Sequence, residues 1–106
     1  MKLKNPKAKG SRVELKAKRQ LEADGWIVEK VKYGGKFNKT VDFFGKWDLL
    51  ALKDSKIMFV QCKCNRKPTM KPYQEFKKRY DWLNLIKMEV WVWYDRVGFD
   101  YIEVKG

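Results

Sequence analysis

Three short segments of this chain carry side chains that could act together in catalysis: Glu14, Asp48 and Gln61-Cys62-Lys63. Hydrolysis of a phosphodiester needs a cation that offsets charge on the phosphorus oxygens, an activated water, and stabilisation of the departing oxyanion. Carboxylates at Glu14 and Asp48 can ligate Mg²⁺, with the Gln61 amide oxygen or the Cys62 main-chain carbonyl completing the shell. Lys63 could orient or deprotonate the water, or neutralise the transition state. The three segments together predict the site of a metal-dependent phosphodiesterase.

Each of these residues also has an ordinary interpretation. Asp48 could form a solvated pair with Lys46 or Lys63, and Glu14 stands four residues before Lys18, the spacing of a surface ion pair on a helix. Lys63 alone could be one more solvated lysine. The alignment of three separate elements on one place favours the catalytic interpretation.

A β-hairpin is predicted to position most of the site. Residues 47–53 and 57–63 read as two strands joined at Asp54-Ser55, both good turn formers. A symmetric turn there would give the following opposed pairs: Lys53 with Lys56, Leu50 with Phe59, and Asp48 with Gln61. Because side chains alternate along a strand, one face should carry Asp48, Gln61 and Lys63, and the other Leu49, Val60, Cys62 and Cys64.

The remaining elements follow from hydrophobic spacing. Residues 11–24 are predicted to form a helix with Ser11 as N-cap and Gly25 after its end. Its buried stripe would be Val13, Ala17 and Leu21, with Glu14 at the edge of that face. We further expect a strand at 26–33, a loop at 34–40, a helix at 73–86 after a loop bracketed by Pro68 and Pro72, and a hairpin of 89–95 with 99–104. The predicted order is helix, strand, strand, strand, helix, strand, strand.

The composition indicates one small folded domain. The chain has 106 residues, with 44% hydrophobic and 36% charged residues. We expect a flexible basic arm at 1–10 and a single domain at 11–106. No apolar run approaches the roughly 20 residues of a membrane span and no hydrophobic signal region follows the N-terminus, so we expect a cytoplasmic protein that does not bind a membrane.

The charge balance indicates a polyanionic partner. The formal net charge is +12, with 25 Lys and Arg against 13 Asp and Glu. The surplus gathers at 1–19 and 63–79, whereas solubility alone would favour mixed signs. We predict a nucleic-acid partner bound mainly through its phosphates. The best candidates for phosphate contacts are Lys7, Lys9, Arg12, Lys16, Arg66, Lys67 and Lys71.

The cysteines and the lack of histidine narrow the chemistry. Cys62 and Cys64 are too few and too close for a disulfide framework or a four-ligand zinc site, and as small core residues they would share a strand face. The chain has no histidine, which argues against zinc chemistry and a histidine base. A catalytic metal would be an oxygen-preferring ion, Mg²⁺ or Mn²⁺.

The chain has an acid in the first helix and an aspartate at the start of one strand. The next strand carries an acid or amide, then any residue, then lysine. This pattern resembles the PD-(D/E)XK nuclease superfamily. KGSRVELKAKRQLEADGWIVEKV and KWDLLALKDSKIMFVQCKC are similar to segments of archaeal Holliday junction resolvases and related restriction-endonuclease-like proteins. The resemblance, from Lys9 through the last strand, implies an α/β fold with a central mixed sheet of about five strands flanked by helices. It also implies a Mg²⁺-dependent endodeoxyribonuclease acting on structured or branched DNA.

Carried over by position, the resemblance makes Glu14, Asp48 and Gln61 metal-site residues and Lys63 the catalytic lysine. Gln74 corresponds to a polar position that often supports the site, although a helix-surface group is its ordinary role. Asp42 could be an extra ligand or replace Asp48.

Two departures from the family pattern stand out. The family usually has Glu or Asp where this chain has Gln61, and a segment VDFFGKWD is inserted after the first long strand, where the resolvases carry a loop serine. The competing interpretations are a non-catalytic nucleic-acid-binding module that keeps the fold, and an RNA-binding protein of ribosomal type.

Aromatic residues provide two further expectations. Trp82 or Tyr73 could stack on bases, the alternative being core or dimer packing. We predict a homodimer for two reasons. Residues 91–94 (Trp-Val-Trp-Tyr) carry more hydrophobic area than a small monomer easily buries. Two cuts on a symmetric substrate would also require two active sites.

Overall fold

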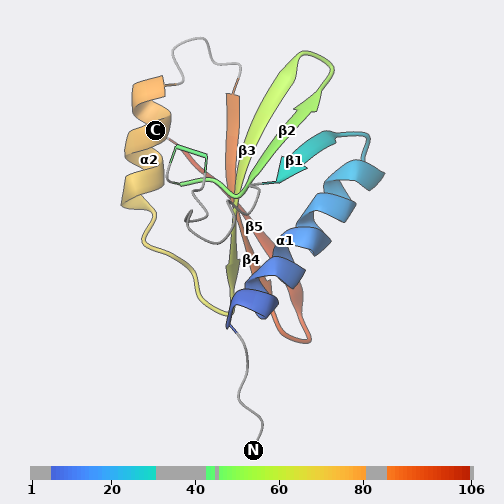
Figure 1. Cartoon of the computed structure of the whole chain (residues 1–106). Helices are drawn as coiled ribbons and strands as arrows, with labels where there is room; N and C mark the ends of the chain where they lie inside the picture. Colours follow the sequence, from blue (N-terminus) through green and yellow to red (C-terminus); the bar gives the residue numbers. More distant parts are fainter. Residues whose placement is uncertain (1–5, 31–42, 45, 81–85, 106) are drawn as a thin grey trace, which may run out of the picture.

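The computed structural model describes residues 6–30, 43–44, 46–80 and 86–105. Within them the elements follow the predicted order (Figure 1): α1 (Pro6–Ala23), β1 (Ile27–Lys30), β2 (Leu49–Lys53), β3 (Lys56–Cys64), α2 (Lys71–Tyr80), β4 (Ile86–Tyr94) and β5 (Gly98–Glu103). The expected loop at 34–40, the strand residues 31–33 and the helix residues 81–85 lie outside the described ranges. No helix among the described residues is long and apolar enough to cross a membrane.

The strands form one mixed sheet in the order β1-β2-β3-β4-β5. All neighbours are antiparallel except β3 and β4, which are parallel. Parallel neighbours need a crossover connection, and α2 lies in the segment that joins β3 to β4. Figure 1 shows α1 and α2 on opposite sides of the sheet.

The first helix begins five residues earlier than predicted. It starts at Pro6, so Ser11 lies within the helix and is not its N-cap, and residues 6–10 of the expected arm are helical. Proline is favoured in the first helical turn because its φ is already helical and its missing N–H has no intrahelical acceptor there. The end agrees with the prediction, because Gly25 has φ 94° and the main-chain bonds Gly25 N to Glu22 O and Trp26 N to Leu21 O form a Schellman cap.

Two hydrophobic clusters form the core, one on each side of the sheet. The α1 side contains the predicted stripe, with Val13, Ala17 and Leu21 buried against strand residues that include Leu49, Val60 and Cys62. The α2 side is aromatic, and its buried members are Trp47, Phe59, Tyr73, Phe76, Met88, Val90, Val92 and Val104. The predicted alternation along β3 is therefore confirmed for its hydrophobic residues.

The central hairpin has the predicted register from the turn as far as Leu49. Lys53 pairs with Lys56, Leu50 with Phe59 and Leu49 with Val60. Asp54 and Ser55 both have positive φ, 47° and 65°, which is the conformation of a two-residue hairpin turn. The ladder stops at Leu49, two residues after the predicted strand start.

The C-terminal half differs from the prediction at its boundaries. Helix α2 begins at Lys71, so Pro72 lies in its first turn rather than ending a loop. Strands β4 and β5 form the expected hairpin. Trp91 and Val92 are buried by the chain itself, and Trp93 and Tyr94 are half-buried, so the hydrophobic area of 91–94 does not require a second subunit.

Candidate active site

Asp48 lies where β2 leaves the sheet. Its main-chain N–H donates to the carbonyl of Val60 at 2.9 Å, and its Oδ2 accepts a hydrogen bond from the Cys62 N–H at 3.0 Å. In a continued antiparallel ladder the Cys62 N–H would donate to the carbonyl of Trp47. That carbonyl instead accepts from the Phe43 N–H at 2.8 Å. The Asp48 carboxylate therefore replaces a main-chain partner and is fixed against the backbone of β3.

The Gln61 side chain is directed at Asp48. Two acceptors face the amide, Asp48 Oδ2 and the carbonyl of Lys46, so the nitrogen must point toward them. Nε2 donates to Asp48 Oδ2 at 3.1 Å and to the Lys46 carbonyl at 2.6 Å. Asp48 and Gln61 are both buried, with 7% and 6% of their surface exposed. The sequence prediction that these two residues meet is confirmed, but they meet through the amide nitrogen and not through its oxygen.

Glu14 approaches the same place from α1. The pKa of the buried Cys62 thiol is raised well above its ordinary value, first by burial and then by the negative charges of Asp48 and Glu14. The negative charges of both carboxylates therefore reach the Cys62 thiol. Cys62 belongs to the α1-side cluster, so Glu14 approaches from the side of the sheet opposite to Gln61. Glu14 belongs to the α1 side, Gln61 to the α2 side, and Asp48 lies between them where the ladder ends.

Lys63 follows the alternation of β3. It pairs with Val92, and Val92 and Val90, the partner of Gln61, both belong to the α2-side cluster. Lys63 is half-buried. Lys63 and Gln61 therefore share one side of the sheet, as predicted from their spacing.

The donor set suits a hard cation only in part. Two carboxylates, an amide oxygen and the main-chain carbonyl of Cys62 are ligands of the kind that Mg²⁺ prefers. Among the described residues, however, no three His, Cys, Asp or Glu side chains are grouped to hold a metal. The third ligand would be the Gln61 amide oxygen, which requires the amide to rotate by half a turn from its present hydrogen bonds. These residues therefore suit a metal ion if the Gln61 amide turns its oxygen toward the site.

The other predicted site residues are less closely placed. Asp42 lies outside the described residues. Gln74 is exposed on α2, and its support of the site stays a prediction. Tyr73 is 8% exposed and packs against Trp47 with ring centroids 5.3 Å apart. The prediction that Tyr73 stacks on bases is therefore wrong, and the alternative that it packs in the core is confirmed. Trp82 lies outside the described ranges.

The candidate phosphate-binding residues lie on α1 and in the segment that follows β3. Lys7 and Lys9 lie in the first turns of α1, and the exposed candidates are Arg12, Lys16, Arg66, Lys67 and Lys71. Trp93 connects the two groups, because Lys16 Nζ lies 4.9 Å from its ring centroid and its carbonyl accepts from the Asn65 N–H at 2.6 Å. Lys16 of the first basic segment and Asn65 of the second therefore both contact Trp93, at the end of β3 that carries Lys63.

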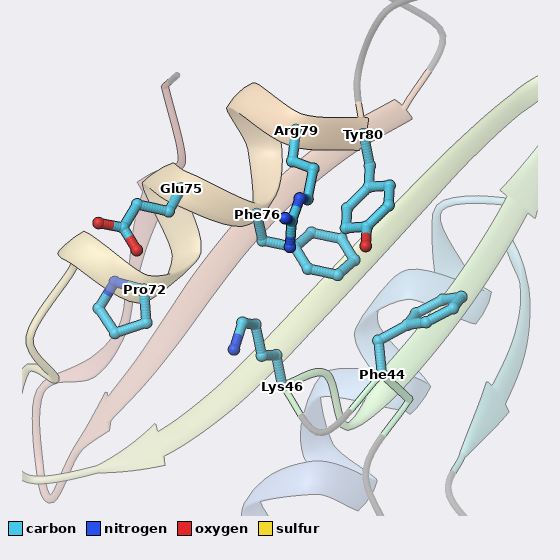
Figure 2. Close-up of a pocket in the computed structure, with 7 residues that line it drawn as sticks. All are labelled: Phe44, Lys46, Pro72, Glu75, Phe76, Arg79 and Tyr80. Carbon is cyan, nitrogen blue, oxygen red and sulfur yellow. The ribbon is translucent and has the colours of Figure 1, made fainter.

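Sequence reasoning missed the role of residues 43–47. Phe43 and Trp47 form an isolated antiparallel bridge, Lys46 presents its carbonyl to Gln61, and Phe44 and Lys46 line a pocket against α2 (Figure 2). The FFGKW sequence gave the only signal, since a run of aromatic residues beside a glycine and a lysine is unusual for a surface loop. Its position next to Gln61 depends on the fold.

The fold is similar to that of a solved structure. No family model matches the chain, and no curated protein matches it. A solved structure of Hjc, a Holliday junction resolvase from the archaeon Archaeoglobus fulgidus, matches with a TM-score of 0.62 and 14% sequence identity, over 90% of this chain and 77% of that chain. The chain has a restriction-endonuclease-like fold. The predicted fold class is confirmed.

Proposed function

We propose that the chain is a Mg²⁺- or Mn²⁺-dependent endonuclease that hydrolyses phosphodiester bonds in structured or branched DNA. The observation that carries the proposal is the fixed group at the end of β2, where Asp48 is held by the Cys62 N–H and by Gln61. The negative charges of Asp48 and Glu14 both raise the pKa of the Cys62 thiol, after the larger effect of burial. A resolvase has the same fold, and the net charge of +12 suits a DNA partner.

The proposal assigns a role to each residue of the site. Glu14, Asp48, the Gln61 amide oxygen and the Cys62 carbonyl would hold the cation, which when bound supplies positive charge to the phosphorus oxygens. Lys63, two residues beyond Gln61 on the same side, would orient the water or donate hydrogen bonds to the developing negative charge. The basic residues of α1 and of residues 66–71 would position the DNA backbone.

The amide at Gln61 also supports a second candidate function. In its present orientation the Gln61 nitrogen offsets the charge of Asp48 by hydrogen bonding, much as a cation would. A chain that keeps this bond permanently would bind DNA without cutting it. The runner-up is therefore a non-catalytic nucleic-acid-binding module of the same fold.

Cleavage assays separate the two functions. Labelled duplex, flap and four-way-junction DNA would be incubated with wild type, Asp48→Asn and Lys63→Ala in Mg²⁺ or Mn²⁺. We expect both variants to lose about a hundredfold or more in rate while they keep DNA binding. Matched controls are Asp100→Asn and Lys87→Ala, since both residues are exposed and lie outside the site. Wild type that binds but cuts none of these substrates, or variants that cut as fast as the controls, would refute the nuclease proposal.

The mode of DNA binding has its own test. Contacts to phosphates release counterions, so affinity should fall steeply as salt rises. Fluorescence anisotropy between low and physiological salt measures the slope, and a flat response would exclude a phosphate-based interface. A homodimer, which two cuts on a symmetric junction would require, is tested by light scattering with and without junction DNA.

A further inference from the structure

A pocket of about 540 Å³ lies between α2 and residues 43–47. Figure 2 shows Phe44 and Lys46 on one side of it and the α2 residues Phe76, Arg79 and Tyr80 on the other. The volume falls in the range of roughly 300–1,000 Å³ that is typical of small-molecule sites. The pocket is large enough for a ligand of the size of one nucleotide.

Aromatic rings line this pocket on two sides. The buried ring of Phe76 lies 5.7 Å from Phe44 and 4.7 Å from Tyr80, measured between centroids. Phe44 is 70% exposed and Tyr80 is 44% exposed. Two accessible rings that flank a buried ring form a surface suited to a flat, aromatic ligand.

The backbone holds Phe44 in this exposed position at a conformational cost. Its φ is 54°, in the left-handed region that is unfavourable for a bulky residue. The turn is fixed by the bonds from the Phe43 N–H to the Trp47 carbonyl and back, at 2.8 and 3.0 Å. Such outliers often occur at functional positions, where surrounding structure maintains them. A large ring held exposed by a strained turn indicates a binding role.

Two cations accompany the rings. The side chains of Lys46 and Arg79 both line the pocket (Figure 2), and the Arg79 guanidinium lies 5.9 Å from the Tyr80 ring centroid. Glu75 and Pro72 line the pocket near the start of α2, where the Glu75 carboxylate points away from the aromatic rings (Figure 2). Cations beside aromatic rings are the combination that recognises a base together with its phosphate.

Lys46 joins the pocket to the candidate active site. Its side chain lines the pocket, whereas its main-chain carbonyl accepts from Gln61 Nε2 at 2.6 Å. Gln61 in turn contacts Asp48. A ligand in the pocket would therefore be only one residue away from the groups that would hold the scissile phosphate.

We propose that this pocket binds one unpaired nucleotide of the DNA, with its base against Phe44 and Tyr80 and its phosphate at Lys46 and Arg79. The proposal rests on the proposed function, because it specifies which DNA the site receives. A paired base is stacked inside the duplex and cannot reach such a pocket without being extruded. The pocket selects DNA that offers an unpaired nucleotide beside the cleavage point, with little preference for base identity because every base has a stacking face.

Binding of a fluorescent base tests the pocket without any cleavage. Duplexes would carry 2-aminopurine either in a single-nucleotide bulge or paired with thymine, and would be titrated with protein in EDTA. We expect wild type to quench the bulged base and to prefer the bulged duplex. Phe44→Ala should lose the quenching and weaken binding of bulged DNA by about tenfold. Lys46→Gln should weaken it less.

Matched controls separate the pocket from general charge and aromatic content. Tyr101→Ala removes a half-exposed ring on β5, and Lys87→Gln removes one positive charge from β4; both should behave as wild type in quenching and in preference. Phe44→Leu serves if circular dichroism shows that Phe44→Ala is unfolded. The proposal would be overturned if wild type and the Phe44 variants quench the bulged base equally. It would also be overturned if wild type does not prefer the bulged duplex.

The same assay keeps this failure apart from failure of the nuclease proposal. No metal is present and no cut is measured, so a chain that never cleaves DNA still reports on the pocket. Conversely, cleavage by a wild type that shows no quenching of the bulged base would refute the pocket alone.

Discussion

The two sides of the sheet are packed in different ways. On the α1 side the helix lies close against β1, β2 and β3, and Ala17, which is fully buried, allows this approach. On the α2 side aromatic rings separate helix and sheet, with Trp47 stacked on Phe59 at 5.8 Å between centroids and close to Phe76 at 5.7 Å. The first side is closed, whereas the second opens into the pocket beside residues 43–47.

The difference shows how a small domain can accommodate a site. The close-packed side fixes β3 and Glu14 in place, because a helix that contacts the sheet through alanine leaves little room for movement. The aromatic side spans a larger gap with few residues and leaves accessible rings at its margin. Asp48 lies at the boundary, where the ladder ends and both sides contribute a residue.

The largest effect is expected from the ring at the centre of the aromatic side. Trp47→Ala should lower the free energy of unfolding by about 3–5 kcal/mol, because Trp47 is fully buried and truncation leaves a cavity. Trp47→Phe is the matched control. The Trp47 Nε1 has no hydrogen-bond partner among the described residues, so the smaller ring loses volume but no bond. Urea unfolding measures the free energy of unfolding of both variants. Equal losses of stability in Trp47→Ala and Trp47→Phe would show that the volume of the ring does not hold α2 in place.

The contrast between a closed and an open side predicts different tolerance to substitution. Ala17→Leu should cost about 1–3 kcal/mol, since extra methyl groups have no space between α1 and the sheet. Phe44→Leu, at the exposed margin of the other side, should change stability by less than about 0.5 kcal/mol. Thermal unfolding of the two variants tests the contrast. A stable Ala17→Leu protein would mean that α1 can move away from the sheet.

One added negative charge tests the contact between Gln61 and Asp48 at the boundary of the two sides. Gln61→Glu replaces a donor to Asp48 with a second carboxylate, which should destabilise the metal-free protein by about 1 kcal/mol. Mg²⁺ binding to the folded state should then raise its melting temperature more than that of wild type. Isothermal titration with Mg²⁺ gives the affinity directly. Unchanged affinity would show that this side chain is not a ligand.

The smallest effect concerns the Cys62 thiol on the closed side. Its pKa is raised above the ordinary value of 9.0 by burial and by Asp48 and Glu14. Above that ordinary value the unfolded chain loses a proton that the folded chain keeps, so this thiol's contribution to stability falls as pH rises. Relative to Cys62→Ala, wild type should lose about 0.7 kcal/mol between about pH 8.5 and 9.5.

Alkylation distinguishes the two cysteines in the same pH range. Iodoacetamide should modify the half-buried Cys64 faster than the buried Cys62, because the thiolate is the reactive form and Cys62 resists forming it. Peptide mapping reports the order. Faster labelling of Cys62 would mean that the closed side opens readily.

Local sequence patterns predict the order of the elements, the α1 stripe of Val13, Ala17 and Leu21, the turn at Asp54-Ser55 and the hairpin register. These depend on local periodicity and turn chemistry, which are properties of neighbouring residues. The approach of Gln61 to Asp48 could also be predicted, since the register follows from the turn.

The assembly of the site depends on contacts that form only in the folded chain. The Asp48 carboxylate takes the place of the Trp47 carbonyl because that carbonyl accepts from the Phe43 N–H, and Glu14 comes from the side of the sheet opposite to Gln61. The pocket needs α2 and the 43–47 segment to meet across the aromatic cluster. Such contacts join residues far apart in the chain, and their geometry depends on how the two sides pack rather than on any local pattern.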